Sequence, residues 1–309
     1  MADRGLMRRL LPWGFIMFAG TAWGLSFSLA KIVVEDGAPP LGITYFQAII
    51  SAIVLFLFSL TRGRPLRKIL DNIKLVLIIA MLGAVIPSPI LFIAADHLQA
   101  GILAITIALI PMITYGASIP LKMEKFSPVR IMGLALGVVA IMLISLPENS
   151  LPDPAAIPWI LFALIAVFCY SAENIVLAVR SAATLGPIRL ALGMNVGAVI
   201  MLTPVVFWRG EFIWPGLAMT LPDVSLIGLA IISLLAYTMF IYAISLFGPV
   251  FASQTGYIVT FTGVIWGMII FGESHSLWVW GALLAMIIGL VLVKPNHDDV
   301  DSPEWPERD

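Results

Sequence analysis

The sequence predicts an all-α membrane protein of ten transmembrane helices, arranged as two inverted five-helix repeats. Three observations predict this class: an apolar composition, long uninterrupted apolar runs, and landmarks that recur about 148 positions apart. Of the 309 residues, 61% are hydrophobic and 11% charged, and the mean hydropathy is +1.04. An ordinary soluble domain has about 25% charged residues. At about 20 residues per crossing, roughly eight to eleven spans use up the chain and leave no soluble domain.

Continuous apolar runs define the predicted spans. A backbone in lipid must satisfy its own hydrogen bonds, which leaves helices or closed barrels, and uninterrupted runs favour helices over the alternation typical of barrels. The first run follows Arg4, Arg8 and Arg9, as in a signal peptide, but it extends to Val34, which is too long for one. The predicted spans are 13–34, 41–60, 73–94, 100–121, 129–146, 157–178, 187–208, 224–246, 249–271 and 276–294.

Basic residues set the predicted orientation. With ten spans and a cytoplasmic N-terminus, 15 of the 17 Lys and Arg residues lie in cytoplasmic segments, and only Lys31 and Arg209 lie outside. Such an excess is typical of cytoplasmic loops. We therefore expect a multi-pass protein of the cell inner (plasma) membrane with both termini cytoplasmic.

An internal repeat divides the chain into the predicted units 10–147 and 156–295, followed by a short acidic tail, 296–309, that we expect to be disordered and cytoplasmic. The offsets between matching landmarks are nearly constant, for example 273 − 124 = 149 and 195 − 47 = 148. The matched pairs are Trp13 and Trp159, Trp23 and Tyr170, Gln47 and Asn195, Glu124 and Glu273, and Pro147 and Pro295. Each unit has five spans, an odd number, so the second copy is inverted. Inverted repeats are typical of secondary transporters.

The same motifs resemble a known family. Trp23, Gly24 and Phe27 in TAWGLSF are followed by Lys31, Pro111 precedes Glu124, and FGES carries Glu273. Over residues 10–295 the chain is similar to the EamA family of the drug/metabolite transporter superfamily. This resemblance implies two inverted five-helix units around a central substrate cavity and transport of small metabolites. Where that family often has an arginine in the second helix, this chain has Gln47.

The most conspicuous candidate for function is Glu173, a carboxylate in the apolar run CYSAENIVLAVR. Intramembrane ionisable residues mark ion or substrate pathways. Tyr170, Asn174 and Arg180 share its helix face. Two functional roles fit Glu173: a counter-charge for a cationic or zwitterionic solute, or a proton carrier. A structural role remains open, with Glu173 hydrogen-bonded at helix ends or paired with Arg180.

Other polar and aromatic positions complete the expected substrate site. Gln47 and Asn195 match between the units and either lock helices together or contact substrate, and Trp23 and Tyr170 either wall a cavity or pack in the core. The polar span around 253–260 places Gln254 and Tyr257 toward the pathway. The expected substrate-binding residues are Trp23, Gln47, Tyr170, Glu173, Asn174, Asn195, Gln254 and Tyr257.

Enzyme signatures are missing from the sequence, which has no H-E-x-x-H, P-loop or G-x-S-x-G motif. The lone Cys169 forms no disulfide framework or cysteine metal site, and we expect no cofactor and no metal. We expect a secondary transporter that exports a small metabolite (an amino acid, amine or drug-like solute) by alternating access. Its expected partners are that solute, the lipid bilayer and protons as coupling ion, with a homodimer left open and no nucleic acid. A polytopic membrane enzyme, a scaffold or sensor, and a passive channel are the alternatives.

Overall fold

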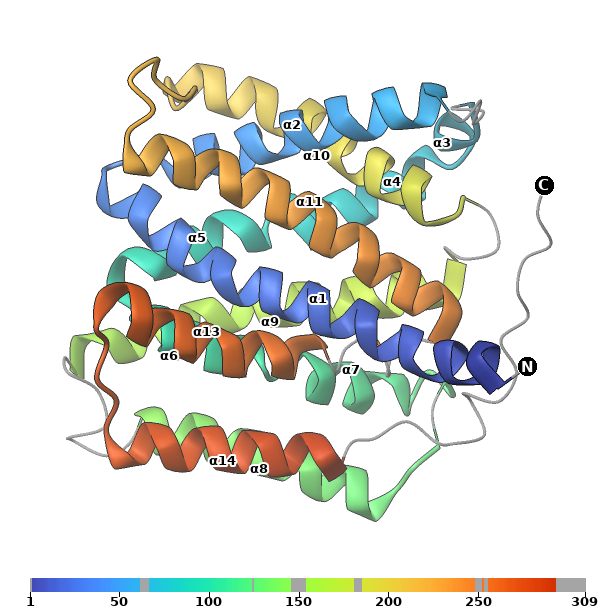
Figure 1. The fold of residues 1–309 in the computed structure, drawn as a ribbon, viewed down its shortest axis with the longest axis vertical. Coiled ribbons are helices and arrows are strands. Elements are labelled where there is room, and N and C mark those ends of the chain that lie inside the picture. The colour runs from blue at the N-terminus through green and yellow to red at the C-terminus, as the bar shows by residue number, and fades with distance from the viewer. Residues whose placement is uncertain are drawn as a thin grey trace.

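The protein is described by a computed structural model that covers residues 2–61, 67–123, 125–145, 154–180, 185–247, 252 and 255–292. In these residues all regular structure is helical, and the helices lie side by side in a flattened bundle (Figure 1). The elements are α1 (Ala2–Glu35), α2 (Pro40–Thr61), α3 (Arg67–Asp71), α4 (Ile73–Ala80), η1 (Met81–Val85), α5 (Pro87–His97), α6 (Ala100–Ile107), α7 (Ile110–Ser118), α8 (Pro128–Ser145), η2 (Pro154–Ala156), α9 (Ile157–Arg180), α10 (Pro187–Arg209), α11 (Leu221–Phe247), α13 (Thr255–Phe271) and α14 (Leu277–Leu292).

Seven helical stretches in the described part are long and apolar enough to cross a membrane, which confirms an all-helical membrane protein. Three shorter apolar helices accompany them: Pro128–Ile144, Ile258–Phe271 and Leu277–Gly289. The ends of most helices agree with the predicted runs within a few residues. The first helix differs, because α1 already begins at Ala2 and includes the basic N-terminal stretch. The predicted tail, 296–309, lies outside the described residues.

Two of the predicted spans are irregular. The predicted span 100–121 corresponds to the apolar stretch Ala100–Ser118, which is divided into α6 and α7. Pro111 has no N–H to give to the Ile107 carbonyl, and the chain makes two shorter-range bonds just before it, from Ala108 N to Ile105 O and from Leu109 N to Thr106 O. The run 73–94 keeps its direction but contains the π-helical turn η1 directly before Pro87.

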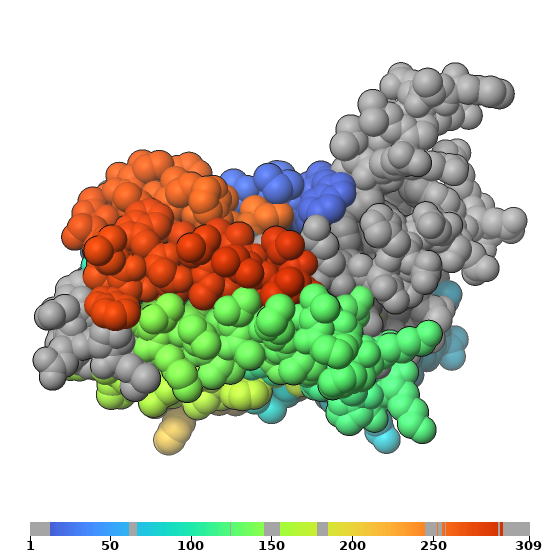
Figure 2. Space-filling model, turned by 90° about the horizontal axis from the view of Figure 1, so that it is seen from below, coloured from blue at the N-terminus to red at the C-terminus, as the bar shows by residue number. Residues whose placement is uncertain are grey.

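The helices pack in pairs. The long α1 runs beside α11 and α13, while α9 packs against α5, α6 and α7. Three further pairs are α2 with α10, α6 with α13, and α8 with α14. Figure 2 shows α8 and α14 lying together over one face of the bundle. In Figure 1, α1 begins at the right edge of the bundle, and α14 runs from the left edge toward the right.

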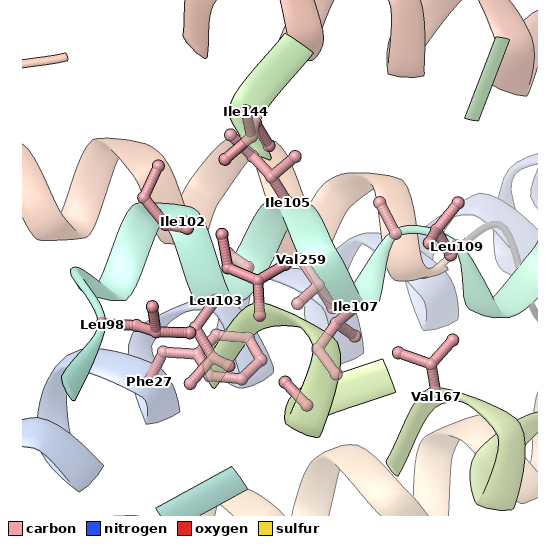
Figure 3. Packing of buried hydrophobic residues seen from close by; sticks show 14 of the residues in the cluster. Phe27, Leu98, Ile102, Leu103, Ile105, Ile107, Leu109, Ile144, Val167 and Val259 are labelled. Atoms are coloured by element: carbon pink, nitrogen blue, oxygen red, sulfur yellow. The ribbon is translucent and has the colours of Figure 1, made fainter. Parts of the chain in front are cut away.

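The largest buried cluster joins α6 and its neighbours. Phe27 of α1, Leu103 and Ile107 of α6 and Val259 of α13 converge from three helices (Figure 3). Thr260 of α13 adds a polar link, because its hydroxyl donates to the Ala104 carbonyl of α6 at 3.0 Å. The centre of the bundle is therefore closely packed on the α6–α13 side.

The buried Glu273 links α13 to α6 at one end of these two helices. Glu273 follows α13, and its two carboxylate oxygens accept hydrogen bonds from Ala100 N at 2.8 Å and Gly101 N at 3.1 Å. Amides in the first turn of a helix have no acceptor within the helix, and the positive end of the helix dipole favours a negative charge there. Glu273 therefore links the end of α13 to the start of α6. Its counterpart Glu124 lies outside the described residues.

Candidate functional site

A central cavity of about 190 Å³ lies between the helices. Its walls come from α1, α2, η1, α5, α6 and α7 on one side of the sequence and from α9, α10, α11 and α13 on the other. Since one water needs roughly 10–15 Å³ of such space, this volume holds on the order of ten waters or one compact solute. Most of the lining is apolar, as is typical of small-molecule sites.

Glu173 supplies the only charged side chain among the described residues that line this cavity. It is 2% exposed and comes from the second half of α9. Its Oε1 accepts a hydrogen bond from the hydroxyl of Tyr237, on α11, at 2.5 Å. Neither lysine, arginine nor histidine lines the described walls. The cavity is therefore suited to a cationic group and unsuited to an anion.

Gly83 allows the Glu173 carboxylate to approach the opposite wall. It lies in η1, and a Cβ at this position would overlap both carboxylate oxygens. Single π-helical turns inside α-helices are frequent at functional sites. The carboxylate is thus held between a tyrosine hydroxyl on α11 and a bare stretch of backbone in η1.

Polar side chains around the cavity are spread over several helices. Asn174 lies next to Glu173, and its Nδ2 is 3.5 Å from Thr114 Oγ1 on α7. Asn195 Nδ2 donates to Ala191 O within α10 at 2.8 Å. Gln47 Nε2 and Thr255 Oγ1 are buried and have no hydrogen-bond partner within the described part of the chain. Groups of this kind are costly to leave unpaired, so they are available to a bound solute or to water.

Aromatic rings form much of the apolar wall. Trp23 of α1 packs edge-on against Phe240 of α11, with ring centroids 5.3 Å apart. Phe27, Phe92, Tyr170 and the ring of Tyr237 also line the cavity. Such rings can pack on the apolar body of a solute and attract a cation to their faces.

Six of the eight residues expected at the substrate site line this one cavity, namely Trp23, Gln47, Tyr170, Glu173, Asn174 and Asn195. Gln254 lies outside the described residues, and the backbone of Tyr257 lies in α13 while its side chain is outside the description. The same holds for the side chain of Arg180. Tyr237 and Gly83 also line the cavity but were not predicted from the sequence. A signal for Tyr237 is its hydroxyl in the apolar run LLAYTMF, and for Gly83 its place just before the Pro87–Pro89 pair.

The chain is similar to known transporters over most of its length. Residues 12–146 and 157–294 each match the EamA-like transporter family. A relative from Escherichia coli strain K12, named "Uncharacterized inner membrane transporter YedA", is 27% identical over 295 residues, covering 93% of this chain and 92% of the relative. The protein of that name from Escherichia coli O157:H7 matches to the same extent.

A protein of known crystal structure has the same overall fold, with a TM-score of 0.61 at 18% sequence identity. The likeness covers 90% of this chain and 96% of the other. Together with the polytopic helical fold and the central cavity, the two family matches over most of the sequence identify the chain as a member of the EamA-like transporter family.

Proposed function

We propose that this protein is a secondary transporter of the inner membrane that exports a small amine, amino acid or similar cationic or zwitterionic solute. The observation that carries the proposal is the single buried carboxylate, Glu173, in a cavity lined by both family-matched halves of the chain. A buried carboxylate without a cationic partner in the described walls calls for an external one, either a solute cation or a proton.

We further propose ten spans in two inverted five-helix units, α1–α8 and α9–α14. The packing supports this division, because exchanging each helix for its counterpart reproduces the same neighbours. Thus α1 packs on α11 and α13 as α9 packs on α5 and on α6 and α7, and α2 packs on α11 as α10 packs on α4. Phe92 and Phe240, with an offset of 240 − 92 = 148, line the same cavity, as Gln47 and Asn195 do.

Alternating access follows from that arrangement. A site between two inverted units opens to either side of the membrane when one unit rocks against the other. The proposed cytoplasmic placement of both termini rests on the basic loops, and the start of α1 and the end of α14 both point to the right in Figure 1. We propose further that transport is export and that it is coupled to protons.

The decisive experiment is uptake of a radiolabelled amine into proteoliposomes that contain the purified chain. A carrier gives saturable uptake that unlabelled solute on the opposite side accelerates; a channel shows no such counterflow, and an enzyme or scaffold gives no flux. Everted vesicles that accumulate the amine more than right-side-out vesicles would support export. Saturable flux of anionic solutes only would overturn the proposed substrate class.

Glu173 has two candidate roles, and one variant separates them. If it is the solute counter-charge, Glu173→Gln loses both net flux and counterflow, because the solute no longer binds. If it carries the coupling proton, the variant loses uptake driven by a pH gradient but retains exchange of labelled for unlabelled solute. Retention of both activities would assign Glu173 a purely structural role.

A further inference from the structure

The two oxygens of the Glu173 carboxylate have unequal surroundings. Oε1 accepts the Tyr237 hydroxyl at 2.5 Å, and Tyr237 is the one hydrogen-bond donor to this carboxylate within the described part of the chain. The backbone of Gly83 closes one side of the carboxylate and leaves no room for a side chain there. Oε1 thus already accepts a hydrogen bond from the protein, whereas Oε2 accepts none within the described part of the chain.

Tyr237 is held firmly in this position. It is 9% exposed and belongs to a buried cluster with Leu234, Phe240 and Ile241 on α11. Turning the hydroxyl away from Glu173 would give up this hydrogen bond to a charged acceptor, which is costly. A solute that displaced Tyr237 from Oε1 would have to compensate for this lost hydrogen bond as well as for its own desolvation.

Cationic groups differ in what they demand of a carboxylate. A guanidinium is a planar fork that binds best when two parallel N–H groups reach both oxygens, whereas an ammonium is a compact charge that needs only one. We propose that Tyr237 is a specificity-determining residue that selects alkylammonium solutes over guanidinium solutes by occupying Oε1. This inference rests on the proposed role of Glu173 as solute counter-charge.

The remaining walls fit an ammonium with an apolar body. Trp23, Tyr170 and Phe240 offer aromatic surface in the same cavity as Glu173. An ammonium that gives one hydrogen bond to the free carboxylate oxygen can place its other side against such rings. A guanidinium confined to one oxygen loses the second bond of its fork and leaves buried N–H groups to be satisfied elsewhere.

The test compares two probes with the same body, 2-phenylethylamine and 2-phenylethylguanidine, by calorimetric titration of the purified full-length chain at pH 7. Both probes are cationic at this pH, so charge alone does not distinguish them. The wild type should bind the amine at least about tenfold more tightly, the effect expected for one charge-assisted hydrogen bond. In Tyr237→Phe the ratio should fall to about one or reverse, because both oxygens become available.

Tyr45→Phe is the matched control, since it removes a buried tyrosine hydroxyl that is hydrogen-bonded to Thr203 and does not line the cavity. It should leave the ratio unchanged. Equal affinities in the wild type would overturn the inference without any variant, and an unchanged ratio in folded Tyr237→Phe would do the same. If both probes bind and both require Glu173, the proposed counter-charge stands even when the ratio fails. If neither probe binds, the proposed substrate class is wrong.

Discussion

Two buried glutamates of this chain have opposite surroundings. Glu273, after α13, receives two backbone N–H groups from the first turn of α6, one for each carboxylate oxygen. Glu173, in the middle of the bundle, receives one tyrosine hydroxyl and borders a cavity. Both are nearly inaccessible, with exposed fractions of 9% and 2%.

The difference shows how the same side chain acquires different tasks. A carboxylate whose two oxygens are both bonded at a helix terminus is stabilised by the fold and in turn stabilises it. A carboxylate with one bond beside an open space is incompletely compensated and gains from any cation that enters. The exposed fraction does not distinguish the two glutamates, whereas the number and kind of their hydrogen-bond donors do.

The largest expected effect comes from making the same substitution at both sites. Glu173→Gln should weaken amine binding at least about thirtyfold, because losing one partner of a buried charge pair costs about 2–5 kcal/mol. Glu273→Gln should leave amine affinity within about threefold of wild type. Calorimetric titration with 2-phenylethylamine measures both. Comparable losses in the two variants would mean that the two glutamates do not have separate tasks.

Stability should show the reverse order. Glu273→Ala leaves the Ala100 and Gly101 amides buried without acceptors, at a cost of about 2–4 kcal/mol. Glu173→Gln should change stability much less, since it removes a charge that the fold compensates poorly. Thermal unfolding of the detergent-purified variants compares them directly. An unfolding midpoint of Glu273→Ala equal to that of the wild type would contradict the capping role.

Replacing Gly83, whose backbone lies against the Glu173 carboxylate, should have a smaller effect on amine binding. In Gly83→Ala the new methyl group overlaps the Glu173 carboxylate and must push it away, so amine affinity should fall about tenfold. Gly256→Ala is the matched control, because Gly256 also lines the cavity but a Cβ there meets only Pro111 at an ordinary 3.5 Å. Similar affinities of the two variants would argue against a defined carboxylate position.

Much of the candidate site follows from local sequence signals. Glu173 stands out because a charge inside an apolar run needs a reason, and the repeat offset brings Gln47 and Asn195 forward as a pair. All three line one cavity, while their roles in substrate binding stay predictions. The EamA membership anticipated from the motifs is confirmed over both halves of the chain.

The partners of these residues could not be predicted. Tyr237 is separated from Glu173 by 64 positions, and which helix faces meet depends on packing that a single sequence does not reveal. How the chain divides into α6 and α7 also depends on packing, since Pro111 is compatible with either a kink or two separate helices. The π-helical turn that contains Gly83 likewise depends on how the turns before Pro87 are accommodated.

The smallest expected effect is a pH dependence that belongs to the Glu273 region alone. His275 lies in the turn between α13 and α14, and its side chain has no exposed surface. Burial lowers the pKa of His275, while the Glu273 carboxylate, whose Oε2 is 3.6 Å from His275 Nε2, acts in the opposite direction. Because the folded protein favours neutral His275, the unfolded chain binds more protons just below the ordinary histidine pKa of about 6.5. Stability should therefore be full above this pH and decline as the pH falls below it.

His275→Asn should flatten the dependence of the unfolding midpoint between about pH 5 and 7, relative to the wild type. His97→Asn, at an exposed position beside Trp159, is the control for replacing a histidine elsewhere in the chain. A slope that persists in His275→Asn would place the titrating group elsewhere, and the cap on α6 would then be independent of its histidine neighbour.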